Sequence, residues 1–252
     1  MGDSSEAGGA AVTAEGLGLR GPRGWVYRDV TFGAEPGSLT VIGGAAGSGR
    51  TSLLLTLSGR MKPTEGQAAV AGLRLPQQAA AVRRIAALGP VPGVNDLEGV
   101  LTVAEHLRER RLLHFSRRAV PFRRTPEDAP RRSVEQALAL AGLTVEELPA
   151  GLGTPVRTLG PLQALQLSTA LALLGRPQLL CVDDADDRLP AADRTAAWAV
   201  LRRVADSGTT VLATATDGSD RADTRLRLDS EATGEAVGTD EIEGADSVDA
   251  QV

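Results

Sequence analysis

The chain has 252 residues, of which 42% are hydrophobic and 23% are charged, a balance that is typical of a globular protein. Its single cysteine, Cys181, excludes a disulfide framework and a multi-cysteine zinc site. No apolar run approaches the roughly 20 residues that a membrane-spanning helix needs. The amino terminus has the pattern of neither a secretory signal nor a myristoylation site, so we expect neither.

Charge is distributed unevenly. The net charge is −5, yet residues 229–252 contain eight acidic residues and no basic one, which leaves +3 on residues 1–228. Lys62 is the only lysine among 27 basic residues, so arginine takes almost every basic position. We expect residues 1–16 and the acidic tail 229–252 to be disordered, because neither holds enough large apolar side chains to bury. The tail is read as a solubilising spacer, with partner binding or autoinhibition as the alternative.

Strand and helix patterns alternate between the two tails. In chain order, the pattern predicts strands over 25–32 and 39–43, a helix over 51–57, a strand over 68–75, helices over 103–113, 133–141 and 162–174, a strand over 179–182, a helix over 191–205 and a strand over 209–214. Strands that alternate with helices predict an α/β fold with a parallel sheet.

The most informative segment follows the predicted strand 39–43 and opens a helix. It reads G-A-A-G-S-G-R-T-S, and its glycines allow the backbone N–H groups to point toward one place, where the positive end of the helix adds to them. Such a loop cradles the β- and γ-phosphates of a nucleotide, and a hydroxyl at Thr51 would bind Mg²⁺. The residues expected to bind the nucleotide here are Gly44, Ala45, Ala46, Gly47, Ser48, Gly49, Arg50, Thr51 and Ser52.

One position departs from the phosphate-loop pattern G-x-x-x-x-G-K-[ST], because Arg50 stands where lysine is expected. In a chain that has almost no lysine, arginine still offers a cation. Guanidinium is planar and wider than ammonium, however, so a loop built for lysine would close around it less well. Weakened binding, near-normal binding and lost binding therefore all stay open, and so does a plain glycine-rich turn without a ligand.

A second cluster supports the first. The segment L-L-C-V-D-D is an apolar strand that ends in two acids, which places carboxylates at the edge of the sheet where the phosphate loop lies. Asp183 would hold Mg²⁺ there, and Asp184 is the candidate catalytic base that orients the attacking water. The alternative is that the two acids form a turn.

At this point the sequence resembles the nucleotide-binding subunits of ATP-binding cassette (ABC) transporters over roughly residues 17–216. The segments that carry the resemblance occur in the family's order: V-Y-R-D-V-T-F, E-P-G-S-L-T-V-I-G-G-A-A-G-S-G-R-T-S-L-L, L-T-V-A-E-H-L, R-T-L-G-P-L-Q, G-R-P-Q-L-L-C-V-D-D and T-V-L-A-T-A-T-D. The resemblance implies a P-loop cassette over 17–228, with a parallel core sheet, an N-terminal antiparallel β part and an inserted helical subdomain over about 95–157.

The family's signature segment L-S-G-G-Q corresponds to residues 159–163, where this chain reads L-G-P-L-Q. In the family this segment binds the γ-phosphate that the opposite subunit holds. The serine hydroxyl is missing at Gly160, and Pro161 has no N–H group to donate. Gln163 is retained, and the resemblance implies that it contacts the nucleotide.

Other functional positions of the family also differ. Gly93 replaces the glutamine of the loop that joins the core to the helical subdomain, and Asp184 is one methylene shorter than the family's glutamate. Pro190 stands in place of an aspartate, and Thr216 in place of the switch histidine. Neither His106 nor His114 can replace that histidine, because both fall in the helical segment.

The aromatic residue that would stack on adenine is expected near positions 21–22, which are Gly21 and Pro22. Trp25 or Tyr27 could substitute, but the strand pattern favours a core or sheet role for both. The nucleotide cradle is therefore mostly present, whereas the residues for hydrolysis are altered at nearly every position.

The segment 105–132 is rich in arginine, with nine arginines and four acids. It is interpreted as a solvated loop, and contact with a permease or with anionic lipid is the main functional alternative. Arginines interleaved with Phe115 and Phe122 also suit nucleic acid, but no nucleic-acid partner is expected.

The resemblance implies an ATP-binding transporter subunit with ATP and Mg²⁺ as cofactors and with slow or absent hydrolysis. Its partners would be a transmembrane permease and a second cassette, in a homodimer or a heterodimer. It would be cytoplasmic and peripheral on the inner face of the cell membrane. The alternative is a regulatory or scaffolding cassette without turnover. A ribosome- or DNA-acting cassette protein is disfavoured, because such proteins usually have two cassettes or a coiled-coil insertion.

Overall fold

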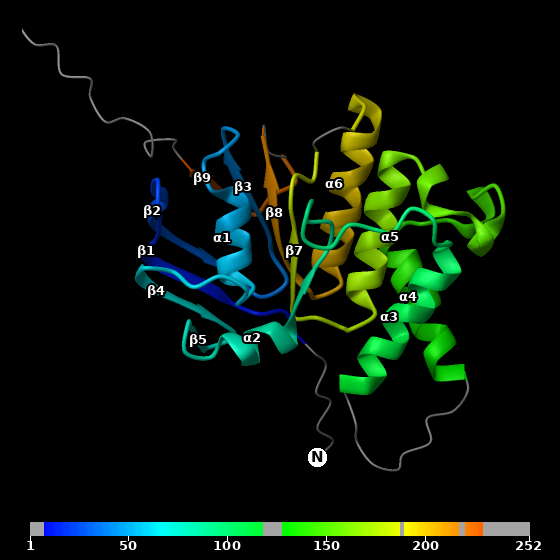
Figure 1. The fold of residues 1–252 in the computed structure, drawn as a ribbon, viewed down its shortest axis with the longest axis horizontal. Helices are drawn as coiled ribbons and strands as arrows, with labels where there is room; N and C mark the ends of the chain where they lie inside the picture. The colour runs from blue at the N-terminus through cyan, green and yellow to red at the C-terminus, as the bar shows by residue number, and fades with distance from the viewer. Residues whose placement is uncertain (1–7, 118–127, 187–188, 217–219, 229–252) are drawn as a thin grey trace, which may run out of the picture.

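The computed structural model describes residues 8–117, 128–186, 189–216 and 220–228. They form two β-sheets with helices around them, as Figure 1 shows. The predicted tail 229–252 lies outside the described residues. The α/β fold with a parallel core sheet and an N-terminal antiparallel part, which the sequence predicted, is confirmed.

The antiparallel sheet has four strands in the order β2-β1-β4-β5. These strands are β1 (Val12–Gly21), β2 (Gly24–Ala34), β4 (Glu65–Val70) and β5 (Leu73–Leu75). The predicted strand 25–32 is confirmed as β2. The turn at residues 22–23 joins β1 and β2 as a hairpin, and it brings Gly21 opposite Gly24.

The prediction that residues 1–16 are disordered is wrong for the part of that segment which β1 contains. Ala10, Val12 and Ala14 are at most 2% exposed, and β1 pairs with both β2 and β4. Val12 and Ala14 in the strand, and Ala10 just before it, alternate with exposed residues and face the core. The segment looked too poor in large apolar residues to fold, but its small residues fit close to the neighbouring layer.

The single strand predicted over 68–75 is also corrected. The chain turns at Ala71 and Gly72, whose φ angles are +49° and +73°, and β4 and β5 then pair as an antiparallel hairpin. Two consecutive residues with positive φ are the backbone of a tight hairpin turn. The alternating pattern continued through this turn and therefore concealed it.

The parallel sheet has five strands in the order β6-β7-β8-β3-β9. They are β3 (Leu39–Gly44), β6 (Ala86–Leu88), β7 (Leu179–Val182), β8 (Thr210–Ala215) and β9 (Thr224–Leu228). The three central strands agree with the predictions, because they are the apolar runs typical of strands buried on both faces. The sequence did not predict the edge strands β6 and β9, which are short or carry arginines at alternate positions.

Six α-helices and three short 3₁₀ turns complete the described residues. The helices are α1 (Arg50–Leu57), α2 (Ala79–Ile85), α3 (Val103–Arg117), α4 (Asp128–Ala141), α5 (Pro161–Leu173) and α6 (Ala191–Asp206). The 3₁₀ turns are Val145–Glu147, Gly151–Gly153 and Val156–Thr158. All five predicted helices are present, and α2 is an addition.

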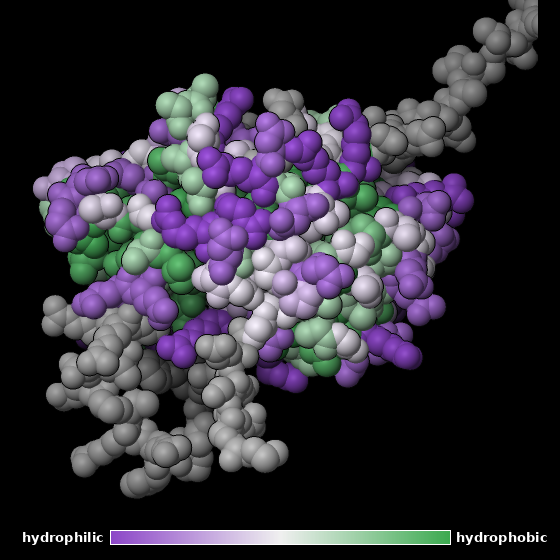
Figure 2. Space-filling model, turned by 180° about the vertical axis from the view of Figure 1, so that it is seen from behind, coloured by the Kyte–Doolittle hydropathy of each residue, from purple (hydrophilic) through white to green (hydrophobic). Residues whose placement is uncertain are grey.

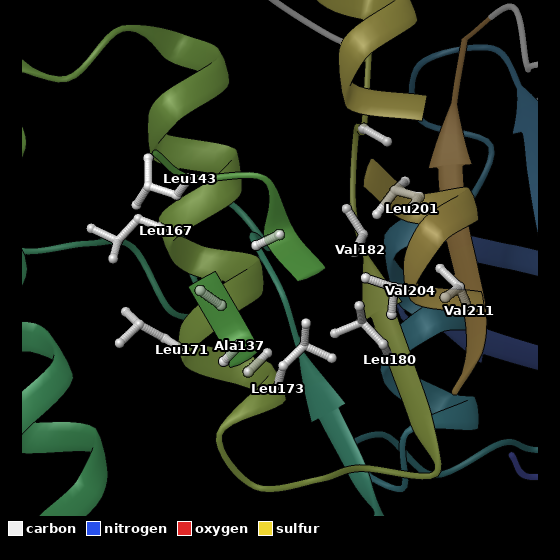
Figure 3. Close-up of a cluster of buried hydrophobic side chains, with 14 of the residues drawn as sticks. Ala137, Leu143, Leu167, Leu171, Leu173, Leu180, Val182, Leu201, Val204 and Val211 are labelled. Atoms are coloured by element: carbon white, nitrogen blue, oxygen red, sulfur yellow. The ribbon is translucent and has the colours of Figure 1, made fainter. Parts of the chain in front are cut away.

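Helices cover both faces of the parallel sheet. Helix α1 lies between the parallel and antiparallel sheets, where Leu53, Leu54 and Leu57 are completely buried in one apolar cluster. On the other face, α5 and α6 pack against β7 and β8. Figure 3 shows Leu180 and Val182 of β7 together with side chains of both helices. The parallel sheet is thus fixed from both sides, and the loops at its edge stand on a rigid base.

Figure 2 shows the opposite side of the molecule, where hydrophilic side chains cover much of the surface. Among the described residues, no helix is long and apolar enough to cross a membrane.

Candidate functional site

The predicted phosphate loop joins β3 to α1, at the carboxyl edge of the parallel sheet. Ala45, Ala46 and Gly47 form its exposed tip, and the N–H group of Ser48 donates to the carbonyl oxygen of Ala45 at 3.1 Å. Ligands of open α/β sheets usually bind at the carboxyl ends of the strands. The loop therefore lies where a ligand is expected.

Two glycines of this loop have no room for a side chain. A Cβ atom on Gly49 would lie 2.2 Å from the carbonyl oxygen of Val26 in β2, and one on Gly44 would lie 2.6 Å from the carbonyl oxygen of Leu228 in β9. Both glycines also have positive φ angles, 86° and 150° respectively. The loop is therefore held between two strands, and its shape depends on glycine at both points.

Two buried polar atoms of the loop have no hydrogen-bond partner. They are Oγ of Ser48, a residue that is 3% exposed, and Nη1 of Arg50, whose side chain is 10% exposed. Buried polar groups are nearly always satisfied in native proteins, and an unsatisfied one costs about 1–3 kcal/mol. These two atoms belong to residues that are two positions apart in the same loop.

The predicted metal residues Thr51 and Asp183 are in direct contact. The Thr51 hydroxyl donates to one carboxylate oxygen of Asp183 at 2.7 Å, and the hydroxyl of Thr214 in β8 donates to the other at 2.5 Å. Asp183 is 4% exposed and follows β7 directly. Hydroxyl and carboxylate oxygens are the ligands that Mg²⁺ prefers, and Mg²⁺ sites usually combine one or two carboxylates with phosphates and water. The donor set therefore fits the predicted ion.

Asp184 lies next to this pair in an unusual backbone conformation. Its φ angle is +46°, in the left-handed region, and its N–H group donates to Oγ1 of Thr214 at 2.8 Å. Its carboxylate forms an ion pair with Arg50, with 3.2 Å between Oδ1 and Nη2. The structure thus brings the acid that was predicted to be the base into contact with the residue that replaces the lysine.

Sequence reasoning missed Thr214. Its hydroxyl contacts both acids, since it donates to Asp183 and accepts from the N–H group of Asp184, and the residue is completely buried. A signal was available: Thr214 is a polar residue near the carboxyl end of the largely apolar strand β8, which is central in the sheet. Such a residue needs a partner, and the two acids directly follow the neighbouring strand β7.

Gln163 lies on a different element. It is in the first turn of α5, where its Oε1 accepts a hydrogen bond from the N–H group of Gly160 at 3.0 Å. Gly160 has no side chain to return this interaction, so the cap has only this one hydrogen bond. Gln163 thus caps its own helix.

The other altered positions have ordinary structural roles. Gly93, with a φ angle of +75°, lies in a turn where its N–H group donates to Oδ2 of Asp96 at 2.9 Å. Pro190 precedes α6 as its N-cap residue. Thr216 is exposed directly after β8. His106 is 7% exposed, with Nε2 3.0 Å from the carbonyl oxygen of Glu98.

The two candidate aromatics differ in environment. Tyr27 is 4% exposed, and its hydroxyl donates to Oγ1 of Thr56 at 2.7 Å, so its core role is confirmed. Trp25 lies with the guanidinium groups of Arg20 and Arg28 at 5.7 and 5.0 Å from its ring centroid. It lines a hollow of about 630 Å³ together with Leu228, but no residue of the loop 45–52 lines that hollow. The hollow is therefore separate from the tip of the phosphate loop.

Comparison with known proteins decides the family. The family model described as "ABC transporter" matches residues 27–187. The chain belongs to the ABC transporter family. The matched span contains the phosphate loop, Asp183 and Asp184.

Two curated relatives differ in how much of them the chain covers. The cytochrome c biogenesis ATP-binding export protein CcmA of Bordetella parapertussis is 32% identical over 242 residues, which are 94% of this chain and 98% of that protein. The phospholipid-transporting ATPase ABCA3 of Homo sapiens is 29% identical over 187 residues, 74% of this chain. The chain spans only 10% of the length of ABCA3.

Solved structures show the same fold at low identity. A dimeric structure of the cassette MJ0796 bound to ADP and Pi has a TM-score of 0.68 at 18% identity and covers 86% of this chain and 94% of its own. CbiO1 of Clostridium perfringens, part of the ABC transporter complex cbiONQ, has a TM-score of 0.69 at 18% identity and covers 86% and 84%.

Proposed function

We propose that this chain is the ATP-binding subunit of an ABC transporter and that it binds ATP with Mg²⁺ at residues 44–52, with Arg50 in place of lysine. The pair of unpartnered buried atoms, Ser48 Oγ and Arg50 Nη1, carries this proposal. A phosphate group has oxygens that would accept hydrogen bonds from both atoms. Its binding would therefore remove the energetic cost of leaving these two buried atoms without a partner. The dimeric relative MJ0796 was solved with ADP and Pi bound.

Different groups of the site would bind the phosphates and the Mg²⁺ ion. Backbone N–H groups of the loop, the Ser48 hydroxyl and the Arg50 guanidinium would bind the phosphates. The Thr51 hydroxyl and the Asp183 carboxylate would hold Mg²⁺, and Thr214 orients that carboxylate from the neighbouring strand. Mg²⁺ would neutralise charge between the phosphates.

We further propose that this subunit alone hydrolyses ATP slowly or not at all. Asp184 is held by Arg50, which opposes its use as a base for water. A misplacement of about 1 Å can lower a rate by about 100-fold, and the shorter side chain of Asp184 adds to that effect. The family positions at Gly93, Pro190 and Thr216 also lack their usual functional groups.

The altered signature segment at the start of α5 favours pairing with a second cassette whose signature is complete. Pro161 removes one N–H donor from the first turn of α5, and Gln163 is used to cap its own helix. We therefore favour a heterodimer in which this chain's phosphate loop faces the intact signature of another cassette. A homodimer would place an altered signature at both sites.

A transmembrane permease is the second proposed partner. Five large apolar side chains of the described residues are exposed, and all fall between residues 94 and 152: Val94, Val100, Leu112, Leu113 and Leu152. Exposed apolar side chains are typical of a surface that contacts another protein where they form a contiguous patch. This segment largely coincides with the helical part that faces the membrane subunit in the family. We therefore place the chain at the inner face of the cell membrane, through the permease.

A regulatory or scaffolding cassette that never turns ATP over is the alternative. The replaced residues at Gly93, Pro190 and Thr216 favour it, because none of them could take part in hydrolysis as the usual residues do. The two functions differ in whether a permease co-purifies and in whether ATP is consumed when a complete cassette is added.

Calorimetric titration with ATP·Mg²⁺ tests the proposal. We expect the wild type to bind and Thr51→Val to bind more weakly with Mg²⁺ than the wild type does. Because Thr51 acts through the metal, the difference in ATP affinity between the two proteins should shrink when EDTA removes Mg²⁺. Absence of binding by the wild type would refute the proposed function.

A further inference from the structure

We propose that Asp184 is a positioning residue for Arg50 and that their ion pair is a latch across the phosphate site, which the nucleotide must open. This inference rests on the proposed function, since it concerns the same loop. It assigns to Asp184 a role other than catalytic base. It also explains together why arginine replaces the family's lysine at position 50 and why aspartate replaces its glutamate at position 184.

The first support is the geometry of the pair. Nη2 of Arg50 lies 3.2 Å from Oδ1 of Asp184, while the other terminal nitrogen, Nη1, is buried without a partner. The guanidinium therefore directs one nitrogen at a carboxylate and leaves one unused. A phosphate group can accept hydrogen bonds from both nitrogens, because the planar guanidinium matches two phosphate oxygens in a forked geometry. Arg50 would therefore gain a hydrogen bond at Nη1 by exchanging Asp184 for a phosphate.

The second support is that Asp184 is held in place from behind. Its N–H group donates to Thr214, whose own hydroxyl donates to Asp183. Its φ angle of +46° is uncommon for a residue other than glycine, and such a conformation persists only where its surroundings enforce it. The strained backbone therefore fixes where the short side chain of Asp184 starts, within reach of Arg50.

The third support is the exposure of the two partners. The Arg50 side chain is 10% exposed and that of Asp184 is 32% exposed, so the carboxylate side of the pair faces solvent. When the pair opens, water can solvate the released carboxylate, whereas the guanidinium would lie against the phosphate. Opening therefore costs less than breaking a fully buried pair would.

Binding of ADP·Mg²⁺ to four proteins tests the latch: the wild type, Asp184→Asn, Arg50→Met and the double variant. ADP is used because a role of Asp184 as base plays no part in its binding. Asparagine is suitable at position 184, because it tolerates a positive φ angle better than most residues. Asp220→Asn is the matched control, since it removes a carboxylate from an exposed ion pair with Arg225.

We expect Asp184→Asn to bind ADP·Mg²⁺ up to about fivefold more tightly than the wild type, the factor that a partly exposed ion pair supports. The gain should be larger with Arg50 present than in the Arg50→Met background, because simple repulsion between Asp184 and phosphate would give equal gains in both. Asp220→Asn should bind like the wild type. The melting temperatures without nucleotide should show that all four proteins are folded.

If the wild type binds ADP·Mg²⁺ and Asp184→Asn binds it equally or more weakly, the latch is overturned. It is also overturned if Asp184→Asn raises the affinity equally in the wild-type and Arg50→Met backgrounds. Either result leaves the proposed function standing. Absence of ADP binding in all four folded proteins would overturn the proposed function, and this inference with it.

Discussion

At the scale of single residues, Thr214 connects the two acids of the site. Replacing it by valine removes the hydroxyl that Asp183 and the Asp184 N–H group share. We expect Thr214→Val to lose about 1–3 kcal/mol of stability, because a buried carboxylate oxygen and a partly buried N–H group each lose a hydrogen-bond partner. It should also weaken the Mg²⁺-dependent part of nucleotide binding.

The control for this prediction is Thr214→Ser, which keeps the hydroxyl and loses one methyl group. Denaturant unfolding and titrations with and without Mg²⁺ measure the two effects. If the serine variant behaves like the valine variant in Mg²⁺ dependence, Thr214 acts through packing and not through its hydroxyl.

Tyr27 gives a second residue-scale prediction, because it is the only tyrosine of the chain. Burial raises its pKa from 10.0 to about 12, and the hydrogen bond with Thr56 offsets part of that rise. A pKa that is raised on folding stabilises the native state fully below pH 10 and less as the pH rises toward 12. Ultraviolet absorbance of the phenolate should therefore stay absent at pH 10 in the folded protein.

Two samples check this interpretation of the absorbance. The urea-unfolded protein should ionise near pH 10, and Tyr27→Phe should show no phenolate signal while losing about 1 kcal/mol of stability. Ionisation of the folded wild type at the same pH as the unfolded chain would contradict the buried position of Tyr27.

At the scale of elements, the phosphate loop depends on its contact with β2. A Cβ atom on Gly49 would meet the Val26 carbonyl oxygen at 2.2 Å, whereas one on Gly47 would meet nothing within 4 Å. Both residues have φ angles near +85°, 86° and 83° respectively, so both would carry similar backbone strain as alanine. We expect Gly49→Ala to destabilise the protein by about 1–3 kcal/mol more than Gly47→Ala, because only Gly49→Ala adds overpacking.

Urea unfolding of the two alanine variants measures this difference directly. Equal losses would mean that the loop can move away from β2, and that backbone strain alone explains the glycine at position 49.

The sequence predicted best the elements that have a strong period or a buried apolar run. The strands 39–43 and 179–182 and all five helices were found, because their patterns follow from burial on one or both faces. It failed at the start of β1, where Ala14 and the preceding Ala10 look like a disordered tail but are buried in the core. It also failed at β6, since three residues carry too little pattern to be distinguished from a loop.

Much of the candidate site could be predicted from the same kind of local pattern. The parts that could not be predicted depend on contacts that form only in the folded chain. The loop and Asp183 follow from local patterns, and the structure brings Thr51 and Asp183 together as expected. The contact between Arg50 and Asp184 could not be predicted, because it joins the start of α1 to the loop after β7 through side-chain reach and a left-handed backbone. Thr214 was missed because its partners are close only in the folded sheet.

At the scale of the whole molecule, Asp223 ties distant segments together. Its carboxylate accepts from the N–H group of Leu39 at 2.7 Å and from Arg202 at 2.5 Å, and so connects β3, α6 and the start of β9. The Leu39 hydrogen bond, followed by that from Arg202, holds the pKa of Asp223 below its usual 3.8. A pKa that is lowered on folding stabilises the native state above the unfolded value, and this stability is lost as the pH falls through the lowered pKa.

We therefore expect Asp223→Asn to melt at a lower temperature than the wild type at pH 7, with a difference that narrows below about pH 4. The effect should be modest, because the Asp223 side chain is half exposed and solvent screens its interactions. Asp220→Asn, which affects only an exposed ion pair, should show little difference at either pH. A gap between Asp223→Asn and wild type that stays constant with pH would contradict the role of the ionised carboxylate.

The central claim is that this cassette binds ATP·Mg²⁺ with arginine in its phosphate loop, and the melting temperature of the purified protein tests it most directly. Ligand at about 100 times its Kd stabilises a fold by about 2.7 kcal/mol, which for a chain of this size corresponds to a rise of roughly 5–10 °C. Our account predicts such a rise for the wild type with millimolar ATP·Mg²⁺, measured beside Arg50→Lys. A rise in Arg50→Lys alone would contradict it, because Arg50 would then silence the site, and no rise in either protein would contradict nucleotide binding altogether.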